Sequence, residues 1–390
     1  MLDLLTAGTL ASLPLTLQTP LFARLRAALH DGGPDRDPRD SSGLTRCVEP
    51  LTCCVEPDIR LRTWLTDALD DPTHASSLLD AARAAADRAL SDAVRHGIEP
   101  VPWGARDYPP LLARISDPPP LLWIRGAAPL LSLPAIAVVG SRAASPYGLE
   151  VAHEFGAGLA ETGVIVVSGL ARGVDSSAHR GALSRGTTAA VFGSGANVIY
   201  PREHAALAAQ IAERGVIVSE LPPGTAPRQH HFPRRNRLIS GLSLAVVVVE
   251  ASTRSGSLQT ARLALEQGRE VMAVPGNVLG ERNRGCHGLL RDGATLVEKA
   301  SDVLDELRLP WSLVEDPPRQ YEQAAGPEEA AADRLALLAS GEVFDFQQLL
   351  TITNLSAGVL LRQLLRAEMS GRVVRTGNGR FLRATAPVVR

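Results

Sequence analysis

The chain has 390 residues, enough for two or three domains, and carries a formal net charge of −2 at pH 7. This balance excludes a protein coated with basic residues, although a local basic groove depends only on where its charges sit. Its 4 cysteines match neither a zinc spacing nor a secreted disulfide framework, so we expect no metal and a reducing, cytoplasmic location. Residues 1–23 lack a basic start and contain Pro14 and Pro20, so we expect neither a signal peptide nor a membrane segment.

Residues 1–95 are predicted to form a small helical domain. Apolar residues recur with helical spacing in 21–29 and 78–93. The stretch 31–42, rich in Asp, Gly, Pro and Arg, is typical of an exposed loop. Nothing in this part of the chain indicates a chemistry of its own.

Residues 96–134 are predicted to be a connector, because their prolines favour an extended path. Within it, Leu121–Ile124 is expected to add a strand to the next domain, residues 135–310. That domain alternates strands and helices, and its β-branched runs are apolar on both faces, as in a parallel sheet covered by helices on each side. We therefore predict an α/β fold with a Rossmann-like, doubly wound, mainly parallel sheet. Its strands are expected near 135–139, 164–168, 188–192, 215–219, 244–250, 271–274 and 294–297.

Residues 311–331 are predicted to be a linker, and residues 332–390 a winged-helix domain. Three helical patterns precede an apolar-polar pair of strands around Asn378-Gly379, a dipeptide that favours a hairpin turn. The sequence leaves open whether this domain contacts DNA or another protein. The helical patterns lie at about 332–340, 344–351 and 355–368.

Three of the predicted strands run into a Gly/Ser turn that carries an arginine, and a helix follows each turn. Glycine lets the backbone approach a ligand, and a helix start offers unpaired N–H groups and a positive dipole end. Parallel strands end at one edge of the sheet, so these turns predict a ligand with several phosphates. The turns contain Gly140-Ser141-Arg142, Gly169 to Gly173 with Arg172, and Arg254-Ser255-Gly256-Ser257.

The stretch 221–249 has arginines but no Asp or Glu. Arginines interleaved with an aromatic and an amide suit phosphates and a stacked base. The alternative is that these arginines pair with acids elsewhere, which we disfavour because no acid lies within the stretch. Arg202 is expected to border the same sheet edge. The residues concerned are Arg228, Phe232, Arg234, Arg235, Asn236 and Arg237.

The sequence matches no complete motif for catalysis or for binding a cofactor. Gly193-Ser194-Gly195 follows a predicted strand but does not open a helix, as a dinucleotide fingerprint requires, and Gly256 lacks a Walker lysine nearby. Asp175 and His179 share a helix face; a catalytic pair is conceivable, but a helix-start carboxylate and a structural histidine fit better. Cys286-His287 is interpreted as structural or interfacial. We expect no catalytic residue and no cofactor.

Taken together, the sequence motifs of residues 140–257 strongly resemble those of the DprA family, also called Smf, of DNA-processing proteins. The resemblance spans about residues 100–300. It implies a cytoplasmic bacterial protein that binds and protects single-stranded DNA during natural transformation and loads RecA recombinase onto it. It also implies a homodimer and, in some members, a sterile-alpha-motif-like N-terminal domain and a winged helix. The motifs are Gly140-Ser141-Arg142, Ser168 to Asp175, His179, Gly193-Ser194-Gly195, Tyr200-Pro201, Ser219-Glu220, Phe232 to Ser243, and Glu250 to Ser257.

The resemblance also implies roles for individual residues. Phe232 would pack on a base, Asn236 would bond to one, and Gly285–Val297 with His287, Leu290 and Leu296 would form the dimer and RecA-facing surface. Phosphates would be held by Gly140, Ser141, Arg142, Gly169, Arg172 and Gly173, and a further one by Arg254, Ser255, Gly256 and Ser257; Arg202, Arg228, Arg234, Arg235 and Arg237 would line the pocket.

An enzyme is the rival interpretation. The same sheet resembles the nucleotide-monophosphate phosphoribohydrolases of the LOG or lysine-decarboxylase-like type, whose glycine-rich motif ends in catalytic glutamates. Here that run ends in Gln259 and Thr260, and neither can replace a carboxylate as a general base. We therefore disfavour hydrolysis. The sequence does not say whether duplex DNA also binds.

Overall fold

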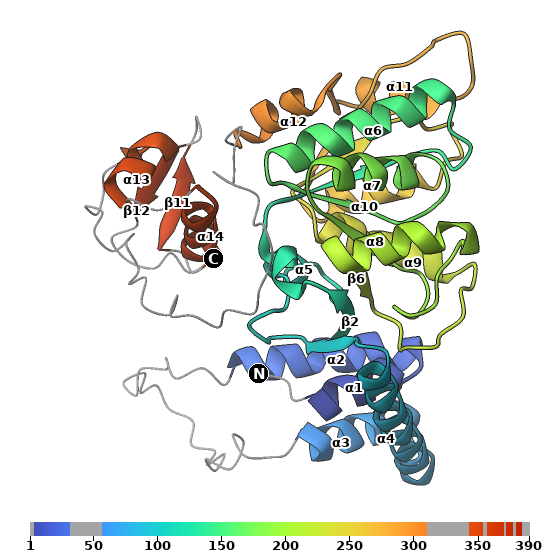
Figure 1. Ribbon diagram of the computed structural model, residues 1–390. Coiled ribbons are helices and arrows are strands. Elements are labelled where there is room, and N and C mark those ends of the chain that lie inside the picture. The colour runs from blue at the N-terminus through green and yellow to red at the C-terminus, as the bar shows by residue number, and fades with distance from the viewer. Residues whose placement is uncertain are drawn as a thin grey trace.

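A computed structural model describes residues 4–31, 57–309, 343–353, 357–369, 372–376 and 380–383 (Figure 1). Among these residues, no helix combines the length and the apolar character needed to cross a membrane.

One large sheet organises the described part of the chain. Its strands follow the order β1-β2-β6-β5-β4-β3-β7-β8-β9. The strands from β6 to β9 run parallel, whereas β2 pairs antiparallel with β6 and β1 antiparallel with β2. The predicted Rossmann-like sheet is therefore confirmed, and so is the extra strand at 121–124; β1 was not predicted. The strands are β1 Glu99–Pro102, β2 Leu121–Gly126, β3 Ala135–Val139, β4 Ile165–Ser168, β5 Thr188–Val191, β6 Val216–Ser219, β7 Ala245–Val248, β8 Glu270–Ala273 and β9 Thr295–Leu296.

Helices cover both faces of the sheet. α9, α10 and α11 pack on one face with α5, and α6, α7 and α12 pack on the other. Strands such as β3 and β7 are buried along their whole length, which explains their unbroken β-branched runs. The helices are α5 Pro110–Ala113, α6 Pro146–Glu161, α7 Val174–Arg185, α8 Ala205–Arg214, α9 His231–Gly241, α10 Ser257–Glu266, α11 Arg284–Arg291 and α12 Ala300–Leu307, with 3₁₀ turns η2 Ala128–Ser132 and η3 Arg202–His204.

The strand order reverses between β3 and β7. Because β4, β3 and β7 are consecutive neighbours, the three Gly/Ser turns that follow them lie side by side at the carboxyl edge. This point of reversal is where open α/β sheets form a crevice for ligands. The fold therefore brings together the three turns that the sequence predicted to be adjacent.

The N-terminal helices pack against the β1–β2 end of the sheet (Figure 1). Their apolar residues share one core with Leu121 and Trp123 of β2, and α4 contributes a stripe of buried alanines. Asp71 caps α4 by accepting hydrogen bonds from the Thr73 and His74 amides. Helices were predicted at 21–29 and 78–93; most of the loop predicted at 31–42 lies outside the described residues. The helices are α1 Leu4–Ser12, α2 Leu15–Asp31, α3 Pro57–Leu69 and α4 Pro72–Arg95.

The described C-terminal residues form two helices and a small antiparallel sheet with a core of their own, in which Leu349, Leu360, Leu364, Val373 and Phe381 are buried; this is consistent with the predicted winged helix. Its three-stranded antiparallel sheet has the order β10-β12-β11. The helix predicted at 332–340 and the Asn378-Gly379 turn lie outside the described residues. The elements are β10 Val343–Phe344, α13 Phe346–Thr353, α14 Ala357–Met369, β11 Val373–Thr376 and β12 Arg380–Arg383.

Candidate nucleic-acid interface

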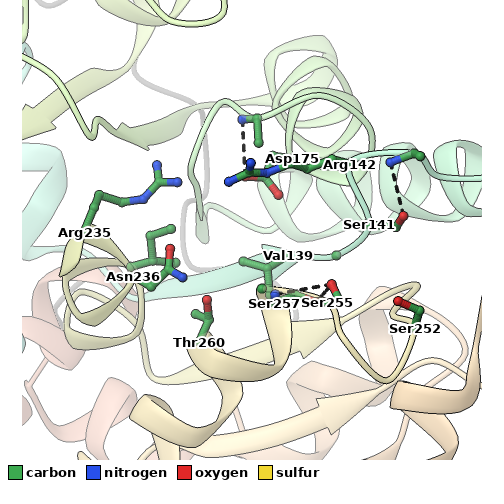
Figure 2. A pocket seen from close by; sticks show the side chains of 15 residues that line it. Val139, Ser141, Arg142, Asp175, Arg235, Asn236, Ser252, Ser255, Ser257 and Thr260 are labelled. Carbon is green, nitrogen blue, oxygen red and sulfur yellow. Dashed lines mark hydrogen bonds between the residues drawn. The ribbon is translucent and has the colours of Figure 1, made fainter. Parts of the chain in front are cut away.

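A polar pocket of about 410 Å³ opens at the switch point between β3 and β7 (Figure 2). The β3–α6 turn, the start of α10 and one side of α9 form its walls. Of the predicted binding residues, the pocket brings together Gly140, Ser141, Arg142, Arg235, Asn236, Ser255, Gly256 and Ser257.

The β3–α6 turn is held in place by Glu250, which follows β7 and is 1% exposed. The Ser141 amide donates to the Glu250 backbone oxygen at 2.6 Å, and the Ser145 hydroxyl donates to the Glu250 carboxylate at 2.5 Å. Arg282 adds a hydrogen bond to the Ala143 oxygen at 2.6 Å and lies 3.8 Å from the carboxylate. These contacts fix the conformation of the turn that carries Arg142. No role for Glu250 was predicted from the sequence.

The β4–α7 turn approaches the first turn closely. Gly173 has a φ of +76°, and a Cβ there would lie 2.2 Å from the Ser141 oxygen, so only glycine fits. The Asp175 carboxylate accepts hydrogen bonds from the Gly169 and Ala171 amides at 3.1 and 3.3 Å. Burial raises the pKa of Asp175, although Arg235 and these amides oppose the increase. Asp175 therefore organises the turn, as the structural interpretation of this helix-start acid expected.

Arg172 of the same turn is exposed but not unpaired. Its Nε and Nη2 atoms donate to the two carboxylate oxygens of Glu203, both at 2.7 Å. A phosphate would therefore compete with Glu203 for this guanidinium.

The start of α10 supplies hydroxyl groups to the pocket. The Ser255 and Ser257 hydroxyls are 2.7 Å apart, and Thr260 lines the same wall one turn further on (Figure 2). Arg254 is exposed beside them. Helix-start amides with several hydroxyls suit an anionic oxygen ligand.

Arg235 on α9 is 4% exposed and faces the pocket. It donates hydrogen bonds to the Gly169 oxygen at 2.8 Å and to the Val191 oxygen. Burial lowers its pKa to about 10, so it remains charged at neutral pH. Arg235 thus joins the exits of β4 and β5 and adds a positive charge to the pocket.

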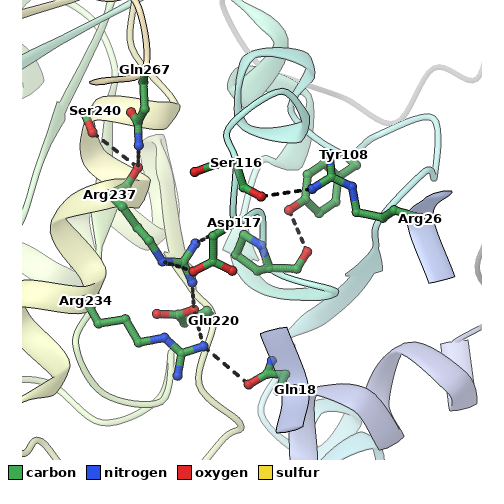
Figure 3. Close-up of polar contacts among 11 residues, drawn as sticks. Gln18, Arg26, Tyr108, Ser116, Asp117, Glu220, Arg234, Arg237, Ser240 and Gln267 are labelled. Atoms are coloured by element: carbon green, nitrogen blue, oxygen red, sulfur yellow. Dashed lines mark hydrogen bonds and ion pairs between the residues drawn. The ribbon is translucent and has the colours of Figure 1, made fainter. Parts of the chain in front are cut away.

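Arg234 and Arg237 do not line the pocket, which corrects the sequence-based placement. Figure 3 shows both guanidiniums turned to Glu220, with the Arg234 pair at 3.1 Å. Arg237 also donates to the Asp117 backbone oxygen and lies 3.4 Å from its carboxylate, and Arg234 reaches Gln18 of α2 at 3.4 Å. Burial raises the pKa of Glu220 against the opposing effect of the two guanidiniums. The alternative that these arginines pair with acids outside their own stretch is therefore correct for Arg234 and Arg237.

The other arginines of the prediction are open to solvent, and of these the pocket lining includes Arg142 but not Arg202, Arg228 or Arg254. Arg142, Arg202, Arg228 and Arg254 are exposed and take part in none of the ion pairs among the described residues. Arg142 instead lies over the Phe232 ring, with its guanidinium carbon 5.6 Å from the ring centre. This contact connects the switch-point pocket to an aromatic site beside it.

Phe232 occupies space that Gly193 leaves open, because a Cβ at Gly193 would lie 2.9 Å from the ring. Its ring centre is 5.4 Å from that of Tyr200, with the planes tilted by 41°. Tyr200 belongs to a motif quoted for the family resemblance, but it was not among the predicted binding residues. The available signal was an aromatic residue in the loop that follows Gly193-Ser194-Gly195, the Gly-rich exit of β5.

The remaining candidate residues lie outside the pocket, and the two buried ones, His179 and Cys286, have surroundings that indicate structural roles. His179 is fully buried; its Nδ1 lies 2.7 Å from the Thr188 hydroxyl, and desolvation lowers its pKa to about 3. Burial raises the pKa of the Cys286 thiol to about 12, so it is not a reactive thiolate. His287 and Leu290 lie on α11, and Leu296 is half-exposed on β9 at the edge of the sheet.

Fold and site together define the class: a Rossmann-like α/β protein with a polar switch-point pocket built from neighbouring Gly/Ser turns. The family model described as DNA recombination-mediator protein A matches residues 100–308, and the chain belongs to this family. The resemblance found in the sequence motifs is thereby confirmed.

Comparison with individual relatives supports the same family. The chain is 41% identical to the protein Smf of Escherichia coli over 283 residues, which cover 72% of this chain and 76% of that relative. It is 46% identical to the DNA processing protein DprA of Streptococcus pneumoniae over 200 residues, 51% of this chain and 71% of the relative. The X-ray structure of the Streptococcus pneumoniae protein aligns with a TM-score of 0.56 at 37% identity and covers 64% of this chain and 92% of that chain.

Proposed function

We propose that this protein binds and protects single-stranded DNA during natural transformation and recombination, and that it loads RecA recombinase onto the strand. The observation that carries the proposal is the set of three adjacent turns at the switch point, with Arg142 and Arg254 exposed and outside the ion pairs of the described residues. Phosphates would be held by turn amides, hydroxyls and guanidiniums. Membership of a recombination-mediator family supports the same substrate.

A preference for single strands follows from the neighbouring aromatic residues. Phe232 and the Asn236 amide lie on α9 beside Arg142. Aromatic rings and amides contact base faces and edges, which are accessible in a single strand but stacked and paired in a duplex. Duplex DNA would therefore bind mainly through its phosphates and more weakly.

The proposed role of the pocket is binding and not catalysis. Asp175 is the carboxylate among the pocket-lining residues, and it is engaged by the Gly169 and Ala171 amides. Gln259 and Thr260 stand where a hydrolase of this sheet type would need acids. RecA contact and homodimerisation are proposed for the α11–β9 side, where Leu296 is 51% exposed on the edge strand.

Fluorescence anisotropy over a salt series tests the proposal. We expect labelled oligo-dT to bind more tightly than a duplex of equal length, with log affinity falling by several units per unit of log salt concentration as counterions are released. A flat salt response, or equal affinity for the duplex, would contradict it. An assay of nucleoside monophosphate hydrolysis, expected to be negative, separates it from the enzyme alternative.

A further inference from the structure

Tyr200 has unusual surroundings for a half-exposed aromatic residue. Its side chain is 48% exposed, yet one side of the ring contacts Phe232 at 5.4 Å between ring centres. Single exposed apolar residues are common on protein surfaces and need no explanation by themselves. Tyr200 does require an explanation, because it contacts Phe232, an aromatic residue that also contacts Arg142.

The backbone before Tyr200 is held by its own hydrogen bonds. The Ser194 hydroxyl donates to the Val198 oxygen at 2.6 Å, and the Gly195 amide donates to the Thr225 oxygen at 2.9 Å. Ile199 packs against the core shared with the N-terminal helices. The ring is therefore presented on a fixed loop, and little conformational entropy is lost when a ligand stacks on it.

Positive charges lie near this ring. Arg202 follows Tyr200 by two residues and has an exposed side chain, and the exposed Arg172 guanidinium is bound to Glu203, the next residue along the chain. An open aromatic face near guanidiniums that suit a phosphate backbone is the arrangement that binds single-stranded nucleic acid without reading its sequence.

We propose that Tyr200 is a base-stacking residue, and that it forms with Phe232 and Arg142 a platform for a nucleobase of the bound strand. The inference rests on the proposed function and adds a residue to it. Phe232 supports the Tyr200 ring from one side, and a base covers the side that is open to solvent. The contact depends on ring area rather than on charge or on the tyrosine hydroxyl.

The test uses the full-length protein with oligo-dT and with an oligomer of equal length in which abasic units replace the bases. Tyr200→Leu is expected to weaken oligo-dT binding roughly tenfold, as for one lost base–aromatic stack. Its affinity for the abasic oligomer and its salt slope should stay at the parent values, because no phosphate contact is lost. Tyr200→Phe should bind as the parent does, since the ring is retained.

The control variant is Leu265→Ala, which removes a 61% exposed apolar side chain near the carboxyl end of α10, and it should leave both affinities unchanged. The platform is disproved if Tyr200→Leu binds oligo-dT like the parent, or if it weakens both oligomers equally. Failure of the proposed function gives a different result, because the parent protein would then bind neither oligomer.

Discussion

The arginines of α9 and those of the strand-exit turns lie within one family motif set, but their surroundings differ. Arg234 and Arg237 are turned to Glu220, where the side chains of Arg237 and Glu220 are 9% and 5% exposed. Arg142, on the β3–α6 turn, is exposed and contacts an aromatic ring instead of an acid. The same residue type thus stabilises the fold in one place and remains available to a ligand in the other. The lesson is that the partner, rather than the motif, decides the role.

Arg237→Ala should have the largest effect, and that effect should be on stability. It leaves Glu220 buried with Arg234 as its remaining cation, and breaking a buried ion pair typically costs about 3–5 kcal/mol. Urea unfolding measures the change in the free energy of unfolding. Arg185→Ala is the matched control, because its pair with Glu161 is exposed and should contribute roughly 0–1 kcal/mol. Equal losses in the two variants would remove the distinction between buried and exposed pairs.

Arg142→Ala should lower the affinity for DNA and leave the stability nearly unchanged. Loss of charge-assisted phosphate hydrogen bonds worth about 1.5–3 kcal/mol should weaken oligo-dT binding roughly 10- to 100-fold. The slope of log affinity against log salt should fall by about 1. Because the side chain is exposed, the unfolding free energy should change by less than about 0.5 kcal/mol.

The control for this variant is Arg262→Ala on α10, which removes another exposed arginine. It should leave the affinity and the salt slope nearly unchanged. If folded Arg142→Ala binds oligo-dT as the parent does, the β3–α6 turn is not part of the binding site.

Glu203→Gln should have the smallest effect, a slight gain in affinity. The Glu203 carboxylate holds Arg172 with two hydrogen bonds, so its neutralisation frees the guanidinium for a phosphate. Anisotropy at low salt, where surface charges are least screened, should show tighter binding and a steeper salt slope. Glu161→Gln, which neutralises the acid of the similar exposed pair with Arg185, should change neither. Weaker binding of Glu203→Gln would mean that the pair positions Arg172 rather than competing for it.

The hydrophobic pattern of the sequence was sufficient to predict most of the fold. The parallel strands were predicted within a few residues of their bounds, because strands buried on both faces must be apolar at every position. β1 was missed because a strand with the sequence Glu-Pro-Val-Pro has no apolar alternation, and its pairing with β2 is visible only in space. The positions of the Gly/Ser turns were also local information, since glycine and serine after a strand predict a turn directly.

The sequence by itself determined the sheet, the three turns and the family. Each of these depends on local patterns: hydrophobic period, turn residues and motif order. The tertiary structure alone decided which arginines are paired and which aromatic rings meet. Asp117 is 120 residues from Arg237, and Glu220 lies just outside the acid-free stretch, so no local pattern shows that they surround one guanidinium. For the same reason the sequence did not indicate the role proposed for Tyr200 or the structural role of Glu250, because both depend on contacts, with Phe232 and Ser145 respectively, that form only in the folded chain.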